Sequence, residues 1–205
     1  LLGALANVSL APTATDDASY DFNGPYIWSA LHRLHQELVS LDAEGIQPQR
    51  IVIAGFSQGA ILANTYLQSL LEESSADHRT LLLPRHILAL SGTVFSRRAP
   101  FASPRKFGNA EEEQEWNHKG SLETVKEPGH SCQVQLLCGD NDRHFRTEQV
   151  HAAAEELQSC YSKSALKDSL DINVIAKIEN GLPHLVSPTM IKACIDAVTS
   201  VASEV

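Results

Sequence analysis

The feature that most constrains the fold is an apolar stretch that runs directly into a glycine-flanked serine and then into a helical pattern. Residues 51–54 (Ile-Val-Ile-Ala) form a continuous apolar run, which is typical of a strand buried on both faces. The sequence Gly55-Phe56-Ser57-Gln58-Gly59 follows at once, and a helix is expected from about residue 58 to 73. A strand, a tight turn and a helix in this order predict one unit of a parallel α/β fold.

The same alternation of strand and helix extends along most of the chain. Further strands are expected at 87–90, at 134–137 and, with apolar residues at every second position, at 171–178. The helices between and after them are expected at about 27–41, with Gly45 as its stop, at 147–161 and at 188–201. We therefore predict the α/β class, with a mostly parallel sheet flanked by helices in a single domain spanning residues 1–205.

The last helix carries the clearest start signal. Ser187 is expected as its N-cap, and Pro188 occupies the first helical position, where the missing N–H is no loss. Its helical spacing predicts a buried stripe made of Ile191, Cys194, Ile195, Val198 and Val201.

Residues 96–131 differ from the rest of the chain. They contain clusters of basic and acidic residues with little periodicity, and they lie between two expected strands. A long irregular segment at such a place is usually functional or without fixed structure, so we expect an irregular insertion or a lid close to the site.

Composition excludes several classes of function. The chain has 16 Lys and Arg against 25 Asp and Glu, a formal charge of −9, which argues against a nucleic acid partner. No apolar run approaches the roughly 20 residues of a membrane span, so stable membrane insertion is not expected. The 4 cysteines are too few and too scattered for a disulfide framework, so we expect reduced thiols and a cytoplasmic location.

The turn around Ser57 has a chemical reason. A serine on a tight turn between strand and helix holds its hydroxyl clear of the sheet, where it can act as a nucleophile. Flanking glycines relieve the clash between the turn and its neighbours. The backbone N–H of Gln58, at the start of the helix, is then placed to stabilise an oxyanion.

A nucleophilic serine needs a base, and the base needs an acid that orients it. Asp140 and Asp142 directly follow the strand at 134–137, and either could be the acid. His184 follows the strand at 171–178 and precedes the last helix. The chain order Ser, Asp, His is the order found in α/β-hydrolases. His144 and His151 have no metal-ligand spacing, so no metal is predicted.

Four motifs in order resemble the acyl-protein thioesterase family, also called the phospholipase/carboxylesterase group of α/β-hydrolases. They are Gly-Phe-Ser57-Gln-Gly-Ala, Ala89-Leu-Ser-Gly92, Gly139-x-x-Asp142 and Gly181-x-x-His184. The resemblance covers roughly residue 20 to the C-terminus, apart from 96–131. It implies an α/β-hydrolase that cleaves acyl thioesters or carboxylic esters through an acyl-enzyme and without a cofactor. Ser57 would be the nucleophile, Asp142 the acid, His184 the base and Gln58 an oxyanion donor.

The chain departs from the family pattern in two places. The family follows its acid with a Val-Pro segment, whereas Asp142 is followed by Arg143-His144-Phe145-Arg146. The family also has an early strand and a His-Gly-rich loop that donates a second oxyanion N–H, and this chain has no such stretch. We therefore expect an N-terminally incomplete α/β-hydrolase with an unpaired interior sheet edge, which is open to homodimerisation.

Two alternatives to the esterase or thioesterase remain. One is a catalytically impaired or truncated hydrolase that acts as a binding protein, because losing one oxyanion donor costs about 10²–10³ in turnover. The other is a different small serine hydrolase family that also uses Gly-Phe-Ser-Gln-Gly. The residues that bind substrate, the acyl chain length and the acyl acceptor are not predicted.

Overall fold

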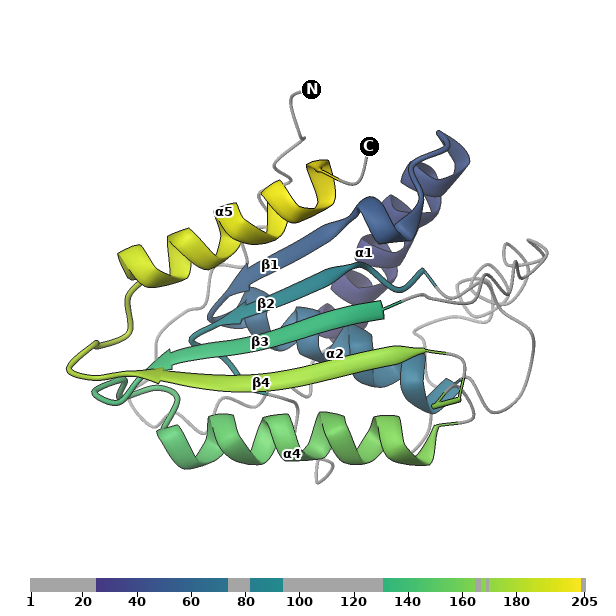
Figure 1. Ribbon diagram of the computed structural model, residues 1–205. Helices are drawn as coiled ribbons and strands as arrows, with labels where there is room; N and C mark the ends of the chain where they lie inside the picture. The colour runs from purple at the N-terminus through teal and green to yellow at the C-terminus, as the bar shows by residue number, and fades with distance from the viewer. Residues whose placement is uncertain (1–24, 74–81, 94–130, 165–166, 169, 204–205) are drawn as a thin grey trace.

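The computed structural model describes residues 25–73, 82–93, 131–164, 167–168 and 170–203 (Figure 1). Four strands and four α-helices, with one short 3-10 helix, alternate along this part of the chain. In chain order they are α1 (Pro25–Ala43), η1 (Pro48–Arg50), β1 (Val52–Phe56), α2 (Gln58–Glu73), β2 (His86–Leu90), β3 (Ser131–Gly139), α4 (Thr147–Lys163), β4 (Asp171–Glu179) and α5 (Pro188–Ala202).

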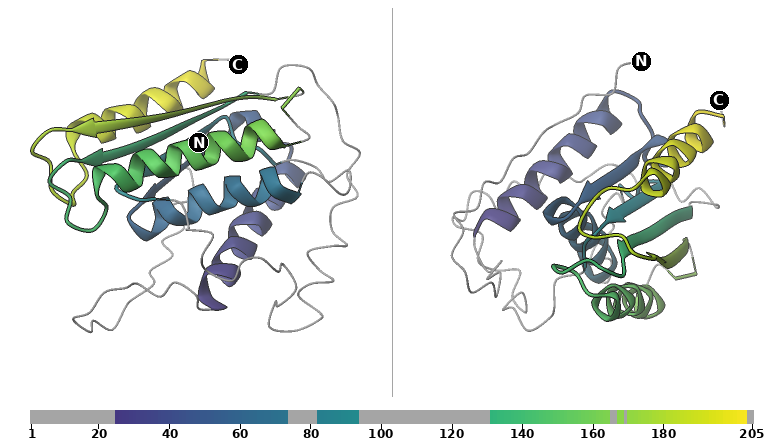
Figure 2. Two further views of the ribbon diagram at one scale, coloured as in Figure 1. Left: turned by 90° about the horizontal axis from the view of Figure 1, so that it is seen from below. Right: turned by 90° about the vertical axis from the view of Figure 1, so that its left-hand side faces the viewer.

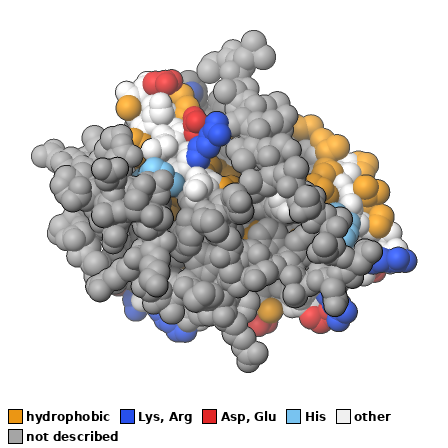
Figure 3. All heavy atoms as spheres, turned by 180° about the vertical axis from the view of Figure 1, so that it is seen from behind, with side chains coloured by type: hydrophobic (Ala, Val, Ile, Leu, Met, Phe, Trp, Pro, Cys, Tyr) orange, Lys and Arg blue, Asp and Glu red, His pale blue; other side chains and the backbone are white. Residues whose placement is uncertain are grey.

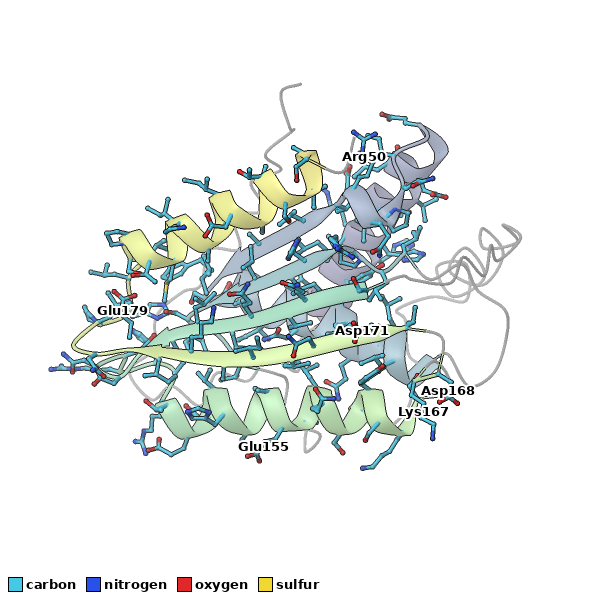
Figure 4. The ribbon with its side chains drawn as sticks, viewed as in Figure 1. Arg50, Glu155, Lys167, Asp168, Asp171 and Glu179 are labelled. Carbon is cyan, nitrogen blue, oxygen red and sulfur yellow. The ribbon has the colours of Figure 1, made fainter. Side chains whose placement is uncertain are left out.

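The four strands form one parallel sheet in the order β1-β2-β3-β4. In the register of the sheet Phe56 pairs with Leu90, and Leu90 pairs in turn with Leu137. The carboxyl ends of all four strands therefore meet at one edge. Figure 4 shows this direction on β4, where Asp171 and Glu179 lie at opposite ends of the strand. Loops that leave this edge are brought together although they are far apart in the sequence.

Helices cover both faces of the sheet. Figures 1 and 2 show α1, α2 and α4 on one side and α5 alone on the other. The main core lies between the sheet and α2 and α4, where Leu67, Val134, Leu136 and Leu157 are fully buried. This three-layer arrangement confirms the predicted α/β class with a parallel sheet.

Helix ends follow the local sequence closely. The predicted limits of α2 are those observed, and α1 ends two residues before Gly45, whose φ of +84° only glycine adopts without strain. Ser187 is the N-cap of α5, as predicted, and its side chain accepts a hydrogen bond from the Met190 backbone N–H.

The prediction that residues 51–54 are buried on both faces is wrong. Ile51 is buried, but Val52 and Ile53 are only half-buried and Ala54 is exposed. The strand buried along its whole length is β2. The reason is position in the sheet, because β2 lies between two strands whereas β1 pairs with β2 alone among the described residues.

The predicted stripe of α5 is also wrong for three of its five members. Ile191, Ile195 and Val198 are 51%, 59% and 57% exposed, while Cys194 is half-buried and Val201 is buried as predicted. The helix instead turns Met190 and Ala197 toward β2 and β3. Hydrophobic side chains are visible along the right-hand side of the back face in Figure 3.

Two sequence expectations fall largely outside the described residues. The insertion or lid at 96–131 is one, since only Ser131, the first residue of β3, is described. The other is the expectation of an incomplete N-terminal part with an unpaired sheet edge, because residues 1–24 are not described.

Among the described helices, none combines the length and the apolar character needed to cross a membrane.

Candidate active site

Ser57 occupies a strained turn between β1 and α2. Its φ is +55°, which is unusual for a residue other than glycine, and its N–H donates to the Leu90 carbonyl at 2.9 Å. A Cβ atom on Gly55 would lie 2.2 Å from the Gly59 carbonyl oxygen, so only glycine fits there. Gly59 differs from expectation, because a Cβ on it would meet nothing within 4 Å among the described atoms. Clash relief therefore depends on Gly55.

The helix α2 starts immediately after the serine. Gln58 is its first residue, and the N–H groups of Ala60 and Ile61 both donate to the Ser57 carbonyl. The Gln58 N–H thus belongs to the N-terminal end of a 16-residue helix, where the helix dipole favours negative charge. No second oxyanion donor is identified in the described part of the chain, which begins at residue 25.

Asp142 is buried in the loop that follows β3, with 5% of its surface exposed. Its Oδ1 accepts the backbone N–H groups of His144 at 2.8 Å and Phe145 at 3.1 Å. Its Oδ2 lies 2.8 Å from His184 Nδ1. Burial alone would raise the pKa of Asp142, but the hydrogen bonds from His184 and from these two amides outweigh it and lower the pKa below the ordinary value. Asp142 is therefore a carboxylate at neutral pH.

Asp140, the other candidate acid, has a different role. It is exposed, and its Oδ1 accepts the backbone N–H of Gly181 at 2.6 Å. Its own N–H donates to the Glu179 carbonyl. Asp140 thus ties the loop after β3 to the loop after β4, while Asp142 contacts the histidine itself.

His184 lies in a short loop that is fixed at both ends. The loop leaves β4 at Glu179 and enters α5 at Ser187, and the Ser187 hydroxyl donates to Glu179 Oε2 at 2.6 Å. Leu185 N–H donates to the Pro183 carbonyl, which closes a tight turn centred on His184. A Cβ on Gly139 would lie 1.8 Å from the Leu182 carbonyl, so glycine there lets the acid loop contact the histidine loop directly.

The three side chains converge at the carboxyl edge of the sheet. His184 Nε2 is 3.1 Å from Ser57 Oγ, on the opposite side of the ring from the Asp142 contact. The Asp142 carboxylate can only accept, so Nδ1 carries the proton of the neutral imidazole and Nε2 is left to accept from the Ser57 hydroxyl. The arrangement can take a proton from Ser57 and hold it on His184.

Three aromatic rings surround His184, and sequence reasoning did not predict them. The ring centroids of Phe56, His144 and Phe145 lie 4.8, 4.7 and 5.5 Å from that of His184. In the sequence, Phe56 directly precedes Ser57, and Phe145 follows Asp142 in the same loop. This closeness in the sequence was the only signal, and it does not show which way either ring points.

No cofactor or metal residues stand out in the described part of the chain. Within it, no three His, Cys, Asp or Glu side chains come together as a metal-binding group. A groove of about 380 Å³ lies between α5 and the sheet, but none of the residues that line it is Ser57, Asp142 or His184.

Comparison with known proteins gives structural neighbours. No protein-family model matches the sequence, and a search of the curated proteins finds no match. Among solved structures, SOBER1 of Arabidopsis thaliana matches with a TM-score of 0.54 at 19% identity, over 86% of this chain. A phospholipase/carboxylesterase of Dyadobacter fermentans matches with a TM-score of 0.52 at 19% identity, over 85% of this chain.

The chain has the α/β-hydrolase fold. The resemblance drawn from the sequence motifs is thus confirmed at the level of the fold. A second SOBER1 structure, of a single-residue variant, matches with a TM-score of 0.52 at 20% identity. The chain covers only 64–65% of the length of these three neighbours.

Proposed function

We propose that this protein is a serine hydrolase that cleaves acyl thioesters or carboxylic esters through an acyl-enzyme. The observation that supports it most is the continuous hydrogen-bonded series from Ser57 through His184 to Asp142, with contacts of 3.1 and 2.8 Å. Such a series on an α/β-hydrolase sheet is the arrangement that activates a serine. The structural neighbour named as a phospholipase/carboxylesterase is consistent with an ester substrate.

The first half of the reaction forms the acyl-enzyme. Ser57 Oγ attacks the acyl carbonyl carbon while its proton passes to His184 Nε2. Asp142 stabilises the imidazolium through Nδ1, and the Gln58 N–H stabilises the negative charge on the former carbonyl oxygen. The tetrahedral intermediate then breaks its bond to the thiol or alcohol, which leaves with the proton from Nε2.

The second half releases the acid. A water molecule gives its proton to His184 Nε2 and attacks the acyl carbon. The C–O bond to Ser57 breaks, and the proton returns from Nε2 to Ser57 Oγ. The free enzyme is restored and one carboxylic acid is formed. No electron transfer takes place, so the steps balance with water as the only co-reactant.

Labelling with a fluorophosphonate tests the nucleophile, and hydrolysis of a short-chain p-nitrophenyl ester tests turnover. We expect both in the wild-type protein and neither in Ser57→Ala. Ser162→Ala, which removes an exposed hydroxyl on α4, is the matched control and should keep both. A folded wild-type protein that neither labels nor turns over would favour the binding-protein alternative.

The choice between thioester and oxygen ester needs a separate comparison. Rates on an acyl thioester and an oxygen ester with the same acyl chain should favour the thioester if the acyl-protein thioesterase resemblance extends to substrate. A strong preference for short oxygen esters would point to the other small serine hydrolase family.

A further inference from the structure

The side chain of Cys138 lies directly behind the acid of the proposed triad. Cys138 is the penultimate residue of β3 and is completely buried. Its Sγ is 3.6 Å from Asp142 Oδ2, the same oxygen that contacts His184 Nδ1. Asp142 Oδ2 therefore has two neighbours that can donate to it, the imidazole and the thiol.

Two further neighbours of this sulfur favour a protonated thiol, and the Ser91 hydroxyl, which can donate or accept, lies near it as well. Cys138 Sγ is also 3.4 Å from the carbonyl oxygens of Gly139 and Phe145. All three of these oxygens can only accept, so a hydrogen bond to any of them needs the S–H group. In agreement, burial and then the nearby Asp142 charge raise the pKa of Cys138 to about 11. The group is a neutral donor at physiological pH and not a thiolate.

We propose that Cys138 is a positioning residue for Asp142, whose S–H sets how strongly the carboxylate holds the proton on His184 Nδ1. This rests on the proposed function, since it concerns the same triad. A donor on Oδ2 draws negative charge away from the His184 contact and makes the carboxylate a weaker acceptor. The S–H group is a weak donor, so it helps to orient the carboxylate while the imidazole remains the stronger donor to Oδ2.

Several other polar, charged and aromatic groups lie close to the His184 imidazole. Asp142 faces Nδ1, Ser57 faces Nε2, and the His144 ring packs against the imidazole from the acid loop. The rings of Phe56 and Phe145 carry no charge. Asp140, in the acid loop, accepts the Gly181 N–H. Glu179, at the end of β4, accepts the Ser187 hydroxyl. Substitutions at Cys138 change none of these side chains.

The test compares Cys138→Ala with Cys132→Ala. Cys132 is equally buried but lies near the opposite end of the same strand, away from the triad, so the two variants create similar cavities at different places. For Cys138→Ala we expect the acid limb of the kcat/KM profile to move to higher pH by about 0.5 pH unit. The shift is small because a weak S–H donor contributes only a fraction of the energy of a full hydrogen bond to a charged group. The plateau should stay within about threefold. Cys132→Ala should leave the limb in place.

A second variant and a second readout keep the test decisive. Cys138→Ser restores a donor and should bring the limb back to the wild-type position or to lower pH. The same shifts should appear in an NMR titration of the His184 imidazole, which needs no turnover and is assigned with His184→Gln. An absent shift in Cys138→Ala, or an equal shift in Cys132→Ala, would overturn the role of Cys138. If Ser57 of the folded wild-type protein does not label with the fluorophosphonate, the proposed function itself is contradicted, whatever the titration shows.

Discussion

The helices on the two faces of the sheet bury their apolar residues to very different extents. On one face, α4 turns its apolar stripe fully toward the core, with Val150, Ala153, Leu157 and Cys160 all buried. On the other face, α5 leaves Ile191, Ile195 and Val198 more than half exposed. Both helices have a clear apolar face in the sequence. Periodicity therefore identifies an apolar face but does not say which neighbour covers it.

The site shows a second contrast, between side chains that contact one another and side chains that hold loops. Asp142 and His184 come from loops tied together by several hydrogen bonds, and Ser57 comes from the end of β1. Under the proposed function, substitutions of groups that contact His184 or fill the core should have large effects, and matched substitutions at residues that do neither should have small effects.

The largest effect is expected for Asp142→Asn. The amide cannot hold His184 in the tautomer with the proton on Nδ1, so kcat should fall by about 10³–10⁴, as a similar change does in a well-known serine protease. Asp140→Asn is the control, because Asp140 contacts Gly181 N–H and not the imidazole. Steady-state kinetics on a p-nitrophenyl ester would measure both. Equal losses in the two variants would contradict separate roles for these aspartates.

A smaller effect on stability separates the two helices. Leu157→Ala removes a fully buried side chain of α4 and should lower the free energy of unfolding by about 2–5 kcal/mol. Ile195→Ala, on the exposed stripe of α5, should change it by less than about 0.5 kcal/mol. Urea denaturation followed by circular dichroism would give both values. A loss at Ile195 comparable with that at Leu157 would show that the stripe is covered in solution.

Homodimerisation, which the sequence leads us to expect at an unpaired sheet edge, stays a prediction, and the exposed stripe of α5 offers a separate surface on which it can be tested. If a second copy binds on α5, Ile195→Lys places a charge in the contact and should raise the dissociation constant of the dimer about tenfold or more. Thr199→Lys adds the same charge at another exposed position of α5 and is the control. Sedimentation equilibrium would measure both. A wild-type protein that is monomeric at all concentrations would end the expectation.

The pH dependence of stability should show the smallest effect, because one group contributes. The folded-state pKa of Asp142 lies below the ordinary value of 3.8. The carboxylate therefore contributes stability above the unfolded-state pKa, and this contribution is lost as pH falls through the folded-state pKa. Unfolding free energies measured between pH 6 and about 2.5 should fall less steeply in Asp142→Asn than in the wild type. Identical slopes would mean that Asp142 is not stabilised in the folded protein.

Sequence reasoning predicted the parts that depend on local chemistry. The limits of α2, the Ser187 cap and the order of Ser57, Asp142 and His184 along parallel strands all follow from the chain itself. Local chemistry left Asp140 and Asp142 open, because both follow the same strand and both are good turn residues, and the choice of Asp142 came from the family resemblance. The distances add that Asp142 contacts the histidine and that Asp140 ties two loops.

The remaining features depend on packing between distant residues. Nothing near Cys138 in the sequence says that its sulfur faces the carboxylate four residues later, because that depends on the path of the acid loop. The rings around His184 are equally hidden, since Phe56 and Phe145 meet there from two different loops. Burial of β1 and α5 was mispredicted for the related reason that burial is a property of neighbours.

The most direct test of the proposed function is to detect the acyl group on Ser57. The protein would be mixed with an excess of an acyl thioester, quenched in acid during turnover, digested and examined by mass spectrometry. We predict the mass of one acyl group on the peptide that contains Ser57, and its absence in Ser57→Ala. An unmodified Ser57 peptide during measurable turnover, or an acyl group found on the half-buried thiol of Cys194 instead, would contradict the account.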